Sequence, residues 1–400
     1  MSKPINIASD ECLRTARITV MGLGHFGGQL AVIHYLANLG CELLVTDMKS
    51  ENDLKGSLEE IRSLVDSGQV ELRLGEHNVS DFTTCDLVVA SPAVPHPWDN
   101  RYLRSAEAAG IPITTEIALT AARIPEVIPV VGITGSAGKS TTAAMTAHIL
   151  RSCAKEHTVH LGGNIGAPLL EHAHKLGESD LVVLELSSFQ LHWLAHEPDL
   201  RFKLAAAIFT NYAPNHLDWH RNEQHYFETK ASLARYAEAP VLVADKELHD
   251  RLYLAGIDSE ICDNLDEPID LPVPGGHNVR NARTAIAGAR STLPNLSADE
   301  AAASLRSYAS LPHRLQPVPT GDDFLSAFND SKSTTPEATT KAVAAFDDPS
   351  QIILIAGGYD KEANMSPMIE CAQDCAHVFT IGTTGPAIAK KLANATSTKT

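Results

Sequence analysis

Continuous apolar runs recur along the chain and are separated by segments with the polar and apolar period of a helix. Such a run is typical of a strand buried on both faces, as in the centre of a parallel sheet. The runs predict strands within residues 18–47 and at 69–74, 86–90, 127–133, 180–186, 203–209, 240–244, 324–328, 351–356 and 377–381. The intervening segments predict helices at 100–109, 139–152, 223–237 and 298–308. Because strands alternate with helices, we expect an α/β fold built on parallel sheets.

The length of the chain divides this pattern into three predicted domains. A chain of 400 residues is too long for one typical hydrophobic core. Breaks fall at the proline-rich stretch 125–129 and at the LPHR stretch 311–314. We therefore expect an N-terminal Rossmann-like domain (1–124), a central P-loop ATPase-like domain with a parallel sheet (125–311) and a C-terminal Rossmann-like domain (312–400).

Composition excludes several classes of partner. The formal net charge of −17 argues against non-specific binding to nucleic acid or to an anionic membrane. No apolar stretch is long enough to span a bilayer, and the first residues lack the apolar centre of a signal peptide. The seven cysteines show no paired metal-binding spacing. We expect a cytoplasmic protein that works as a monomer on small molecules.

The segment VVGITGSAGKSTT at 130–142 carries the strongest chemical signal. A strand, a glycine-rich loop and a helix start follow one another, an arrangement that turns backbone N–H groups toward an anion. Lys139 would add a positive charge, and the Ser140 hydroxyl would reach Mg²⁺. The expected ligand is ATP, although Ile133 stands where the strict pattern has its first glycine. The alternative is a plain strand–turn–helix.

A second glycine pattern lies near the N-terminus. Gly22, Gly24 and Gly27 form G-x-G-x-x-G, and Asp47 follows about twenty positions later. This is the fingerprint of a dinucleotide site, yet no chemistry for a nicotinamide is recognisable downstream. The same geometry holds the diphosphate of any nucleotide conjugate on a helix N-terminus. NAD, a nucleoside diphosphate conjugate and glycines that serve close packing alone all remain open.

Further polar residues follow predicted strands, where an open parallel sheet binds its ligands. Glu185 ends an apolar run, and a metal at the phosphate site would account for its buried charge; the alternative is that it caps a helix or pairs with a nearby arginine. His216, Asp218 and His220 follow another strand and are candidate ligands or acid–base groups. In the third predicted domain the candidates are Asp330, Lys332, Ser333, Thr334 and Lys361.

Four other residues have an ordinary reading. Asn164 lies between glycines and either contacts a ligand or caps a turn. Asn278 and Asn281 share one helical face, where they read an adenine edge or only cap and pack. Lys230 by itself looks like a solvated helix lysine.

Taken together, the motifs resemble the Mur ligase family, within it the D-glutamate-adding branch. The resemblance covers nearly the whole chain and rests on motifs in the right order, of which LELSSFQ and NDSKST discriminate best. The motifs are GLGHFG, SPAVP, TGSAGKST, GGNIG, LELSSFQL, NHLDWH, ETKASL, GGHNVRN, PHR, NDSKSTTP and GGYDK. The resemblance implies an ATP-dependent ligase that joins D-glutamate to UDP-MurNAc-L-Ala through an acyl phosphate, with Mg²⁺ at two sites. It also implies that the first domain holds UDP rather than NAD.

The resemblance assigns roles to single residues. It implies four catalytic residues: Lys139, Glu185, His216 and Lys230, with Lys230 carbamylated. The metal ligands would be Ser140, Glu185, His216 and Lys230. ATP would contact Gly135, Ser136, Ala137, Gly138, Lys139, Ser140, Thr141, Asn278, Asn281, Arg314 and Asp330. The UDP substrate would contact Gly24, His25, Phe26, Asp47, Ser91 and Asn164, and D-glutamate would contact Lys332, Thr334 and Lys361.

The chain departs from the family pattern at several positions. Ala93 replaces a glycine, Asn215 stands where an aspartate often precedes the histidine, and Ser136-Ala137 replaces threonine-asparagine. The sequence stops at Thr400, before the last segment that the family uses to bind D-glutamate, so we expect weak D-glutamate binding. Two rivals stand beside this interpretation: another Mur ligase or a folylpolyglutamate synthetase-like ligase, and a catalytically silent nucleotide-binding regulator.

Overall fold

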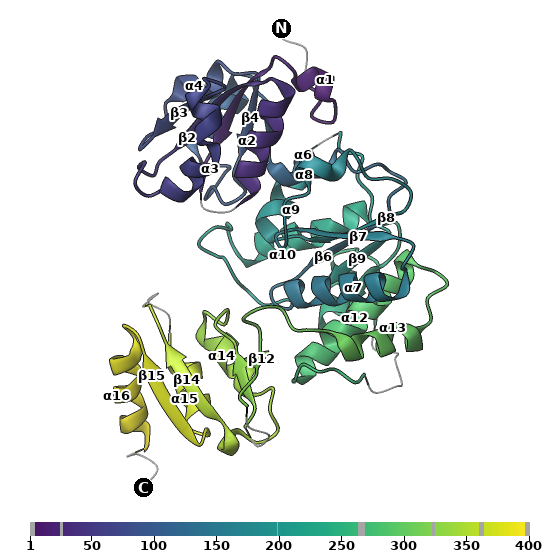
Figure 1. Cartoon of the computed structure of the whole chain (residues 1–400), viewed down its shortest axis with the longest axis vertical. Helices are drawn as coiled ribbons and strands as arrows, with labels where there is room; N and C mark the ends of the chain where they lie inside the picture. Colours follow the sequence, from purple (N-terminus) through teal and green to yellow (C-terminus); the bar gives the residue numbers. More distant parts are fainter. Residues whose placement is uncertain are drawn as a thin grey trace. The chain divides into compact units, whose positions relative to one another are not determined.

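The computed structural model describes residues 5–24, 27–197, 199–262, 269–321, 325–359 and 364–396 (Figure 1). The chain forms two compact units, Met1–Leu265 with Arg283–Ala301 and Asp266–Ala282 with Ala302–Thr400. Parallel sheets flanked by helices confirm the predicted α/β class. The boundaries of the three predicted domains stay a prediction. In the described part of the chain, no helix is both long and apolar enough to cross a membrane.

The first sheet of the first unit is parallel, five-stranded and ordered β3-β2-β1-β4-β5. Apolar side chains of α2 and α3 pack on one face and those of α4 and α5 on the other. The strands are β1 (Arg17–Met21), β2 (Glu42–Asp47), β3 (Val70–Leu74), β4 (Leu87–Ala90) and β5 (Ile113–Thr114). The helices are α1 (Asp10–Leu13), α2 (Gly27–Leu39), α3 (Lys55–Asp66), α4 (Val79–Thr83), α5 (Arg101–Ala108) and α6 (Glu116–Ala121).

The second sheet is also parallel, with six strands in the order β11-β10-β9-β6-β8-β7. In Figure 1, α7 and α12 lie on one face and α9 and α10 on the other. The strands are β6 (Val130–Thr134), β7 (Thr158–Gly163), β8 (Asp180–Glu185), β9 (Ala206–Phe209), β10 (Val241–Val243) and β11 (Ser259–Ile261). The helices are α7 (Lys139–Cys153), α8 (Leu170–Ala173), α9 (Ser188–Leu194), α10 (Glu223–Ala231) with a 3₁₀ turn (Ser232–Tyr236), α11 (Lys246–Leu254), α12 (Gly276–Thr292) and α13 (Ala298–Ser304).

Several element boundaries in this part of the chain differ from the prediction; the strand predicted from residue 203, for example, begins at Ala206. The strand predicted from residue 127 begins at Val130, and Val127 is 66% exposed. Pro129 has no N–H to donate to a neighbouring strand, which accounts for the later start. The helix predicted to reach residue 237 ends at Ala231, because the chain tightens there into a 3₁₀ turn.

The second unit departs from the three β–α repeats predicted for it. The last two repeats are present, as β14 (Ile353–Gly357) and β15 (His377–Ile381) pair in parallel. In the first, β13 (Ala327–Asn329) is followed by a helix as predicted, but it pairs antiparallel with an unpredicted strand, β12 (Gln316–Val318). Strand β12 was missed because it has no apolar run. The remaining elements are α14 (Pro336–Val343), α15 (Ser366–Ala372), α16 (Gly385–Thr396) and 3₁₀ turns at Leu305–Ser307 and Pro349–Gln351.

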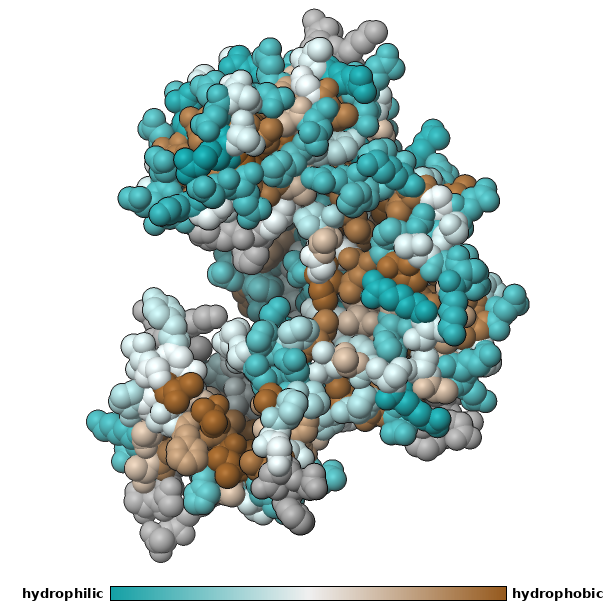
Figure 2. All heavy atoms as spheres, viewed as in Figure 1, coloured by the Kyte–Doolittle hydropathy of each residue, from teal (hydrophilic) through white to brown (hydrophobic). Residues whose placement is uncertain are grey.

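Few apolar side chains hold the β14–β15 pair. Its buried cluster consists of Ala356, Met368, Ile369 and Ile388. The other face of the pair is exposed at Ile353, Ile355, Phe379 and Ile381, each more than half accessible. Apolar residues gather on this unit in Figure 2. Because little apolar area is buried, we expect this pair to be among the least stable parts of the chain.

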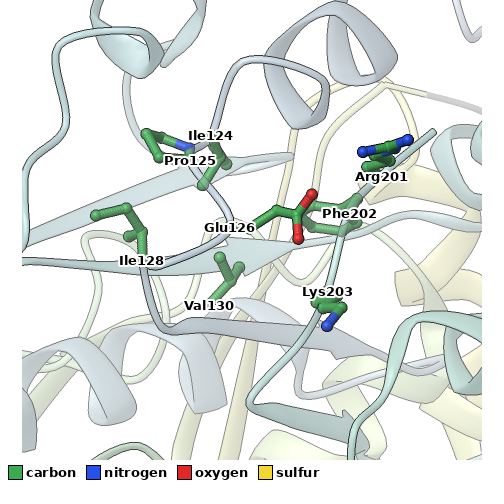
Figure 3. Close-up of a pocket in the computed structure, with 8 residues that line it drawn as sticks. All are labelled: Ile124, Pro125, Glu126, Ile128, Val130, Arg201, Phe202 and Lys203. Carbon is green, nitrogen blue, oxygen red and sulfur yellow. The ribbon is translucent and has the colours of Figure 1, made fainter.

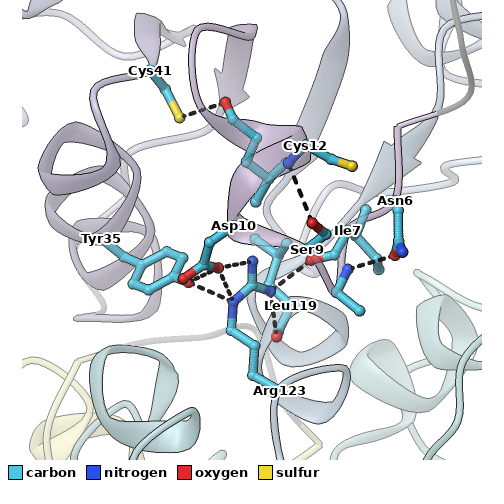
Figure 4. Close-up of polar contacts among 11 residues, drawn as sticks. Asn6, Ile7, Ser9, Asp10, Cys12, Tyr35, Cys41, Leu119 and Arg123 are labelled. Carbon is cyan, nitrogen blue, oxygen red and sulfur yellow. Dashed lines mark hydrogen bonds and ion pairs between the residues drawn. The ribbon is translucent and has the colours of Figure 1, made fainter.

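A buried arginine ties the N-terminal segment to the first sheet and its linker (Figure 4). The Arg123 side chain is 2% exposed and pairs with Asp10 at 3.0 Å. It also donates to the Tyr35 hydroxyl at 2.6 Å and to the carbonyl oxygens of Ile7 and Leu119 at 2.7 and 2.9 Å. Since these acceptors come from α1, α2 and α6, this one guanidinium joins three elements.

Replacing this arginine should therefore destabilise the first unit. We expect Arg123→Met to lower the free energy of unfolding by about 1–3 kcal/mol, because buried acceptors lose their donor. The loss of stability stays below that for a fully buried ion pair, because the Asp10 side chain is 35% exposed and water can hydrate its carboxylate. The urea midpoint of tryptophan fluorescence measures the change. Arg62→Met is the control, since its pair with Glu59 is exposed on both sides. Equal midpoints for the two variants would contradict the assignment.

Candidate functional site

Four loops meet at the carboxyl ends of the second sheet. Strand β6 lies between β8 and β9, and β7 flanks β8. From β6 the chain goes to β7, toward one edge of the sheet, whereas from β8 it goes to β9, toward the opposite edge. Such a reversal opens a crevice above the strand ends in an open parallel sheet. The loops that follow β6, β7, β8 and β9 therefore all face one crevice.

The loop after β6 has the backbone of a phosphate-binding loop. Gly135 and Gly138 have φ of +147° and +79°, in the region that favours glycine. A Cβ at Gly135 would lie 2.0 Å from the Thr210 hydroxyl oxygen, so no side chain fits there. Gly138 caps α7, whose first residues are Lys139, Ser140 and Thr141. The predicted strand–loop–helix is confirmed, and its N–H groups lie at a helix N-terminus, which favours anions.

Asn211, which the sequence analysis did not single out, fixes this loop from the end of β9. Its side-chain amide donates to the Ala137 carbonyl oxygen at 2.8 Å and accepts from the Ala137 N–H at 3.0 Å. The Thr210 hydroxyl donates to the same carbonyl oxygen at 2.6 Å. These contacts turn the carbonyl away from an incoming anion. The only signal in the sequence was a polar residue directly after a strand.

Loss of the hydrogen bonds between Asn211 and Ala137 should weaken ATP binding. We expect Asn211→Ala to raise the dissociation constant for ATP on the order of tenfold, because two hydrogen bonds that preorder the loop disappear. Isothermal titration of ATP measures the change. Asn295→Ala, at an exposed position of the same unit, is the matched control. Equal ATP affinity in the two variants would show that the loop holds its shape without Asn211.

Two lysines converge on this loop. The Nζ atoms of Lys139 and Lys230 donate to the same Gly135 carbonyl oxygen, at 3.0 and 2.8 Å. Lys230 comes from α10, is 2% exposed and lies over the Tyr226 ring at 4.8 Å. Burial, and then the charge of Lys139, lower the pKa of Lys230 well below its ordinary value. Lys230 is therefore not the solvated helix lysine of the ordinary reading.

Glu185 lies beside these lysines at the end of β8. Its side chain is buried, and Oε1 accepts from the Asn164 side-chain amide at 3.1 Å. No hydrogen-bond donor among the described residues reaches the other oxygen, Oε2, although it too is buried. Its charge is attracted to Lys230. A buried carboxylate oxygen without a donor fits a cation as its missing partner.

Asn164 is held against Glu185 through its backbone as well. Its N–H donates to the Glu185 carbonyl oxygen at 2.8 Å. A Cβ at the preceding Gly163 would lie 2.2 Å from that oxygen, so the glycine permits the close approach. The amide thus faces the crevice rather than only capping a turn.

Of the three titratable residues that follow β9, His216 and His220 both feel the charge of Lys230, and His216 also feels that of Lys139. Partial burial, followed by the charges of Lys230 and Lys139, lowers the pKa of His216. The ring of His220 hydrogen-bonds the Ser188 hydroxyl at 3.0 Å. Asp218 offers its backbone carbonyl oxygen to His96.

Metal binding would need more than acidic and imidazole groups. Across the described ranges, no set of three His, Cys, Asp or Glu side chains could hold a metal ion. Glu185 and His216 supply two such groups. Ser140, a substrate phosphate or a modified Lys230 would have to complete the coordination.

The glycine turn of the first sheet is braced by Asp47. Its carboxylate accepts from the N–H groups of Gly24 and Lys49 at 3.1 and 2.9 Å. A Cβ at Gly22 would lie 3.1 Å from the Ser91 Cβ, so the turn and the loop after β4 adjoin. The predicted contacts His25 and Phe26 lie outside the described residues.

The start of α2 also adjoins the second sheet. A Cβ at Gly27 would lie 3.7 Å from Cγ of Pro168, in the loop that carries Asn164. The glycine turn of the first sheet and the crevice of the second are therefore neighbours in the first unit.

The remaining predicted contacts lie in the second unit. The amides of Asn278 and Asn281 are buried and bond to the Pro274 carbonyl oxygen and to each other, as the capping alternative predicts. One Asp330 oxygen accepts from the Leu315 N–H at 2.9 Å. Arg314, Lys332 and Thr334 are exposed, and Lys361 lies outside the described residues.

A small pocket lies at the opposite end of the second sheet (Figure 3). Its lining comes from 124–130, before and at the start of β6, and from 201–203, before β9. These are the amino ends of the strands. The pocket is therefore no part of the crevice at Lys139.

Comparison with known proteins gives consistent matches. The Mur ligase middle domain matches residues 133–255, and the MurD-like N-terminal domain of Mur ligases matches residues 16–115. The UDP-N-acetylmuramoylalanine--D-glutamate ligase of Geobacter metallireducens is 30% identical over 96% of this chain and 86% of its own length. The ligase of the same name from Anaeromyxobacter dehalogenans is 32% identical over 97% and 87%.

Solved structures agree on the fold. UDP-N-acetylmuramate-alanine ligase MurC from Thermotoga maritima aligns with a TM-score of 0.57 at 20% identity, over 95% of this chain and 88% of that one. MurF ligase from Thermotoga maritima in complex with ADP aligns with a TM-score of 0.55 at 14% identity, over 95% and 87%. At these identities the likeness concerns the fold alone.

Proposed function

The chain belongs to the Mur ligase family, and from this premise we propose how its residues carry out the reaction. The protein is an ATP-dependent ligase that adds D-glutamate to UDP-N-acetylmuramoyl-L-alanine in peptidoglycan precursor synthesis. A new amide bond forms, and ATP is converted to ADP and phosphate. We further propose that the protein works as a monomer in the cytoplasm.

The UDP-linked substrate lies across the junction of the two sheets. Its diphosphate binds at the N-terminus of α2, where backbone N–H groups favour an anion. Asp47 and Ser91 bind the nucleotide, together with Gly24, His25 and Phe26 of the glycine turn. The contact between Gly27 and Pro168 supports this path, because it brings the diphosphate site next to the loop of Asn164.

ATP places its phosphates on the loop 135–138 and the first turn of α7. Lys139 leaves the Gly135 carbonyl and binds the γ-phosphate, which is the stronger acceptor. Mg²⁺ would be held by the Ser140 hydroxyl and by the free oxygen of Glu185, with His216 near a second ion, and would neutralise charge on the phosphates. Asn278, Asn281, Arg314 and Asp330 would contact the nucleoside, and Lys332, Thr334 and Lys361 would contact D-glutamate.

Lys230 carries the least expected chemistry. A lowered pKa increases the fraction of this buried amine that is neutral, and the neutral amine can attack CO₂, giving a carbamate and releasing one proton. The modification replaces a positive charge beside Lys139 with a negative one. Lys139 and a cation would then both gain an anionic partner, which relieves the repulsion between two ammonium groups on one carbonyl oxygen.

The reaction then proceeds in two steps. An oxygen of the L-alanine carboxylate attacks the γ-phosphorus, and the bond between this phosphorus and the oxygen that bridges it to the β-phosphate breaks. ADP departs, and the L-alanine carboxylate has become an acyl phosphate. The D-glutamate nitrogen attacks the acyl carbon, loses a proton and expels phosphate. Lys139 stabilises the charge on the transferring phosphoryl group, and the two sheets hold the carboxylate in line with it.

One observation carries this proposal: Asn164 bonds Glu185 in the crevice of Lys139 and Lys230, and the loop that carries Asn164 adjoins Gly27, the first residue of α2, through Pro168. Hydroxylamine trapping tests it, since hydroxylamine converts an acyl phosphate to a hydroxamate. Hydroxamate should form with ATP and UDP-MurNAc-L-Ala in the absence of D-glutamate. ADP formation without any UDP-linked substrate would overturn the proposal.

A further inference from the structure

Two hydrogen bonds join the loop that carries His216 to the loop that follows β4. The Trp219 indole N–H donates to the Val94 carbonyl oxygen at 2.9 Å. In return, the His96 ring nitrogen Nε2 bonds the Asp218 carbonyl oxygen at 2.7 Å, which requires the tautomer with a proton on Nε2. Each loop thus supplies one carbonyl oxygen and one ring donor, although about 120 residues separate them along the chain.

Aromatic packing fixes the Trp219 ring on all sides. The side chain is 4% exposed. Its ring lies 5.5 Å from that of Trp98, nearly perpendicular to it, and 4.6 and 5.3 Å from the rings of Phe189 and His192 on α9. The contacts with Trp98 and His192 are edge-to-face, a geometry that favours one relative orientation of the rings. The indole is therefore an anchor between the 91–98 loop, α9 and the loop 215–220.

The Trp219 anchor belongs to the same turn as His216 and so bears on the backbone conformation of His216. The His216 carbonyl oxygen accepts from the backbone N–H groups of Trp219 and His220 at 3.1 and 2.9 Å, which closes a tight turn. His216 has φ of +52°, a left-handed conformation that side chains disfavour. A turn of this kind persists only where surrounding contacts hold it. His96 has φ of +46°, so the opposite loop is held in a disfavoured conformation at the same junction.

We propose that Trp219 is a positioning residue that couples the loop of the UDP-linked substrate to His216. The 91–98 loop begins at Ser91, which adjoins the glycine turn, and ends at Trp98 against the indole. Binding of the substrate to this loop orders the turn that presents His216 to the reacting end. This inference rests on the proposed function, because it takes Ser91 and His216 as contacts of that reaction.

Trp219→Phe tests the coupling, since it keeps an aromatic ring and removes the indole N–H. Trp193→Phe is the matched control, because Trp193 is 8% exposed and none of the described residues accepts from its indole N–H. In Trp219→Phe we expect UDP-MurNAc-L-Ala affinity, measured by titration without ATP, to fall about five- to tenfold, and kcat to fall on the order of tenfold. The KM for ATP should stay within twofold. Trp193→Phe should change none of these values more than twofold.

A second variant and a spectroscopic signal guard against a simple folding defect. His96→Ala removes the reciprocal bond from an exposed side chain and should also weaken UDP-MurNAc-L-Ala binding. Combined with Trp219→Phe, His96→Ala should cause little further loss of affinity, because both substitutions act on one junction.

The chain has three tryptophans, all named above, so intrinsic fluorescence reports on this region. UDP-MurNAc-L-Ala alone should change it in the unaltered protein and in Trp193→Phe, but not in Trp219→Phe.

The outcomes separate this inference from the proposed function. If the unaltered protein does not bind UDP-MurNAc-L-Ala, the proposed function fails and the coupling fails with it. If the unaltered protein binds it and turns over, while Trp219→Phe and His96→Ala behave like Trp193→Phe, only the coupling is refuted. A uniform loss of kcat and of all affinities in Trp219→Phe, with His96→Ala unaffected, would also refute it and assign Trp219 a structural role.

Discussion

Lys139→Ala is expected to abolish formation of the acyl phosphate while UDP-MurNAc-L-Ala still binds. The Lys139 ammonium lies 3.0 Å from the Gly135 carbonyl oxygen in the loop after β6, whereas we propose that the nucleotide of the other substrate binds on the first sheet. Loss of a preorganised cation from phosphoryl transfer should slow the reaction by about 10³-fold or more. Hydroxamate formation in the presence of hydroxylamine measures this step.

The control for Lys139→Ala is Lys203→Ala. Lys203 belongs to the same unit, and its pair with Glu238 is exposed on both sides, so its removal should leave the rate within twofold. Titration of UDP-MurNAc-L-Ala into both variants checks that the substrate site survives. Turnover of Lys139→Ala within tenfold of the unaltered protein, about 1.4 kcal/mol of barrier, would contradict the role of Lys139.

Lys230→Ala is expected to lose at least about 10²-fold in rate and to regain part of it when acetate or another short carboxylate is added. Lys230 is almost fully buried, so its removal leaves a space beside Lys139 in which a small anion can take the place of the proposed carbamate. Lys230→Glu should keep more activity than Lys230→Ala, because it restores a carboxylate between cations. Initial rates with and without added carboxylate measure both effects.

The opposite pattern would identify Lys230 as a cation. If Lys230→Ala and Lys230→Glu lose the same activity and neither responds to carboxylate, the side chain acts through its positive charge or through packing. Lys246→Ala serves as the control, since Lys246 is exposed and pairs with Asp250 on the surface. It should neither lose activity nor respond to carboxylate.

The elements of the site could be predicted from the sequence because their signals are local. The strand, loop and helix at 130–153 follow from an apolar run, two glycines in left-handed conformations and a helix start. Glu185 was identified because a charge at the end of a buried strand needs a partner. These inferences require only neighbours along the chain.

Asn211 and Trp219 could not be found in this way, because their roles depend on which strands lie side by side. Asn211 reaches Ala137 only because β9 flanks β6. Trp219 reaches Val94 only because the first sheet adjoins the loop after β9. Neither the order of the strands in a sheet nor the contact between two sheets is indicated by the periodic pattern of apolar and polar residues.

Weak or misleading local signals explain the errors. Strand β12 contains Pro317 and no apolar run, so its antiparallel pairing with β13 was missed. Asn278 and Asn281 are a different case, because a shared helical face does not distinguish a ligand contact from a cap. Their amides bond to the protein, and their contact with the nucleoside stays a prediction. Val127 extended an apolar run past Pro129 into exposed chain.

Substrate dependence of phosphate release tests the central claim most directly. With ATP and Mg²⁺ present, phosphate should appear only when UDP-MurNAc-L-Ala and D-glutamate are both added, and mass spectrometry should show one product that has gained a single glutamate residue. One phosphate should be released for each product molecule. Phosphate release at the same rate with either substrate omitted, or with no change in mass of the UDP-linked substrate, would contradict the account.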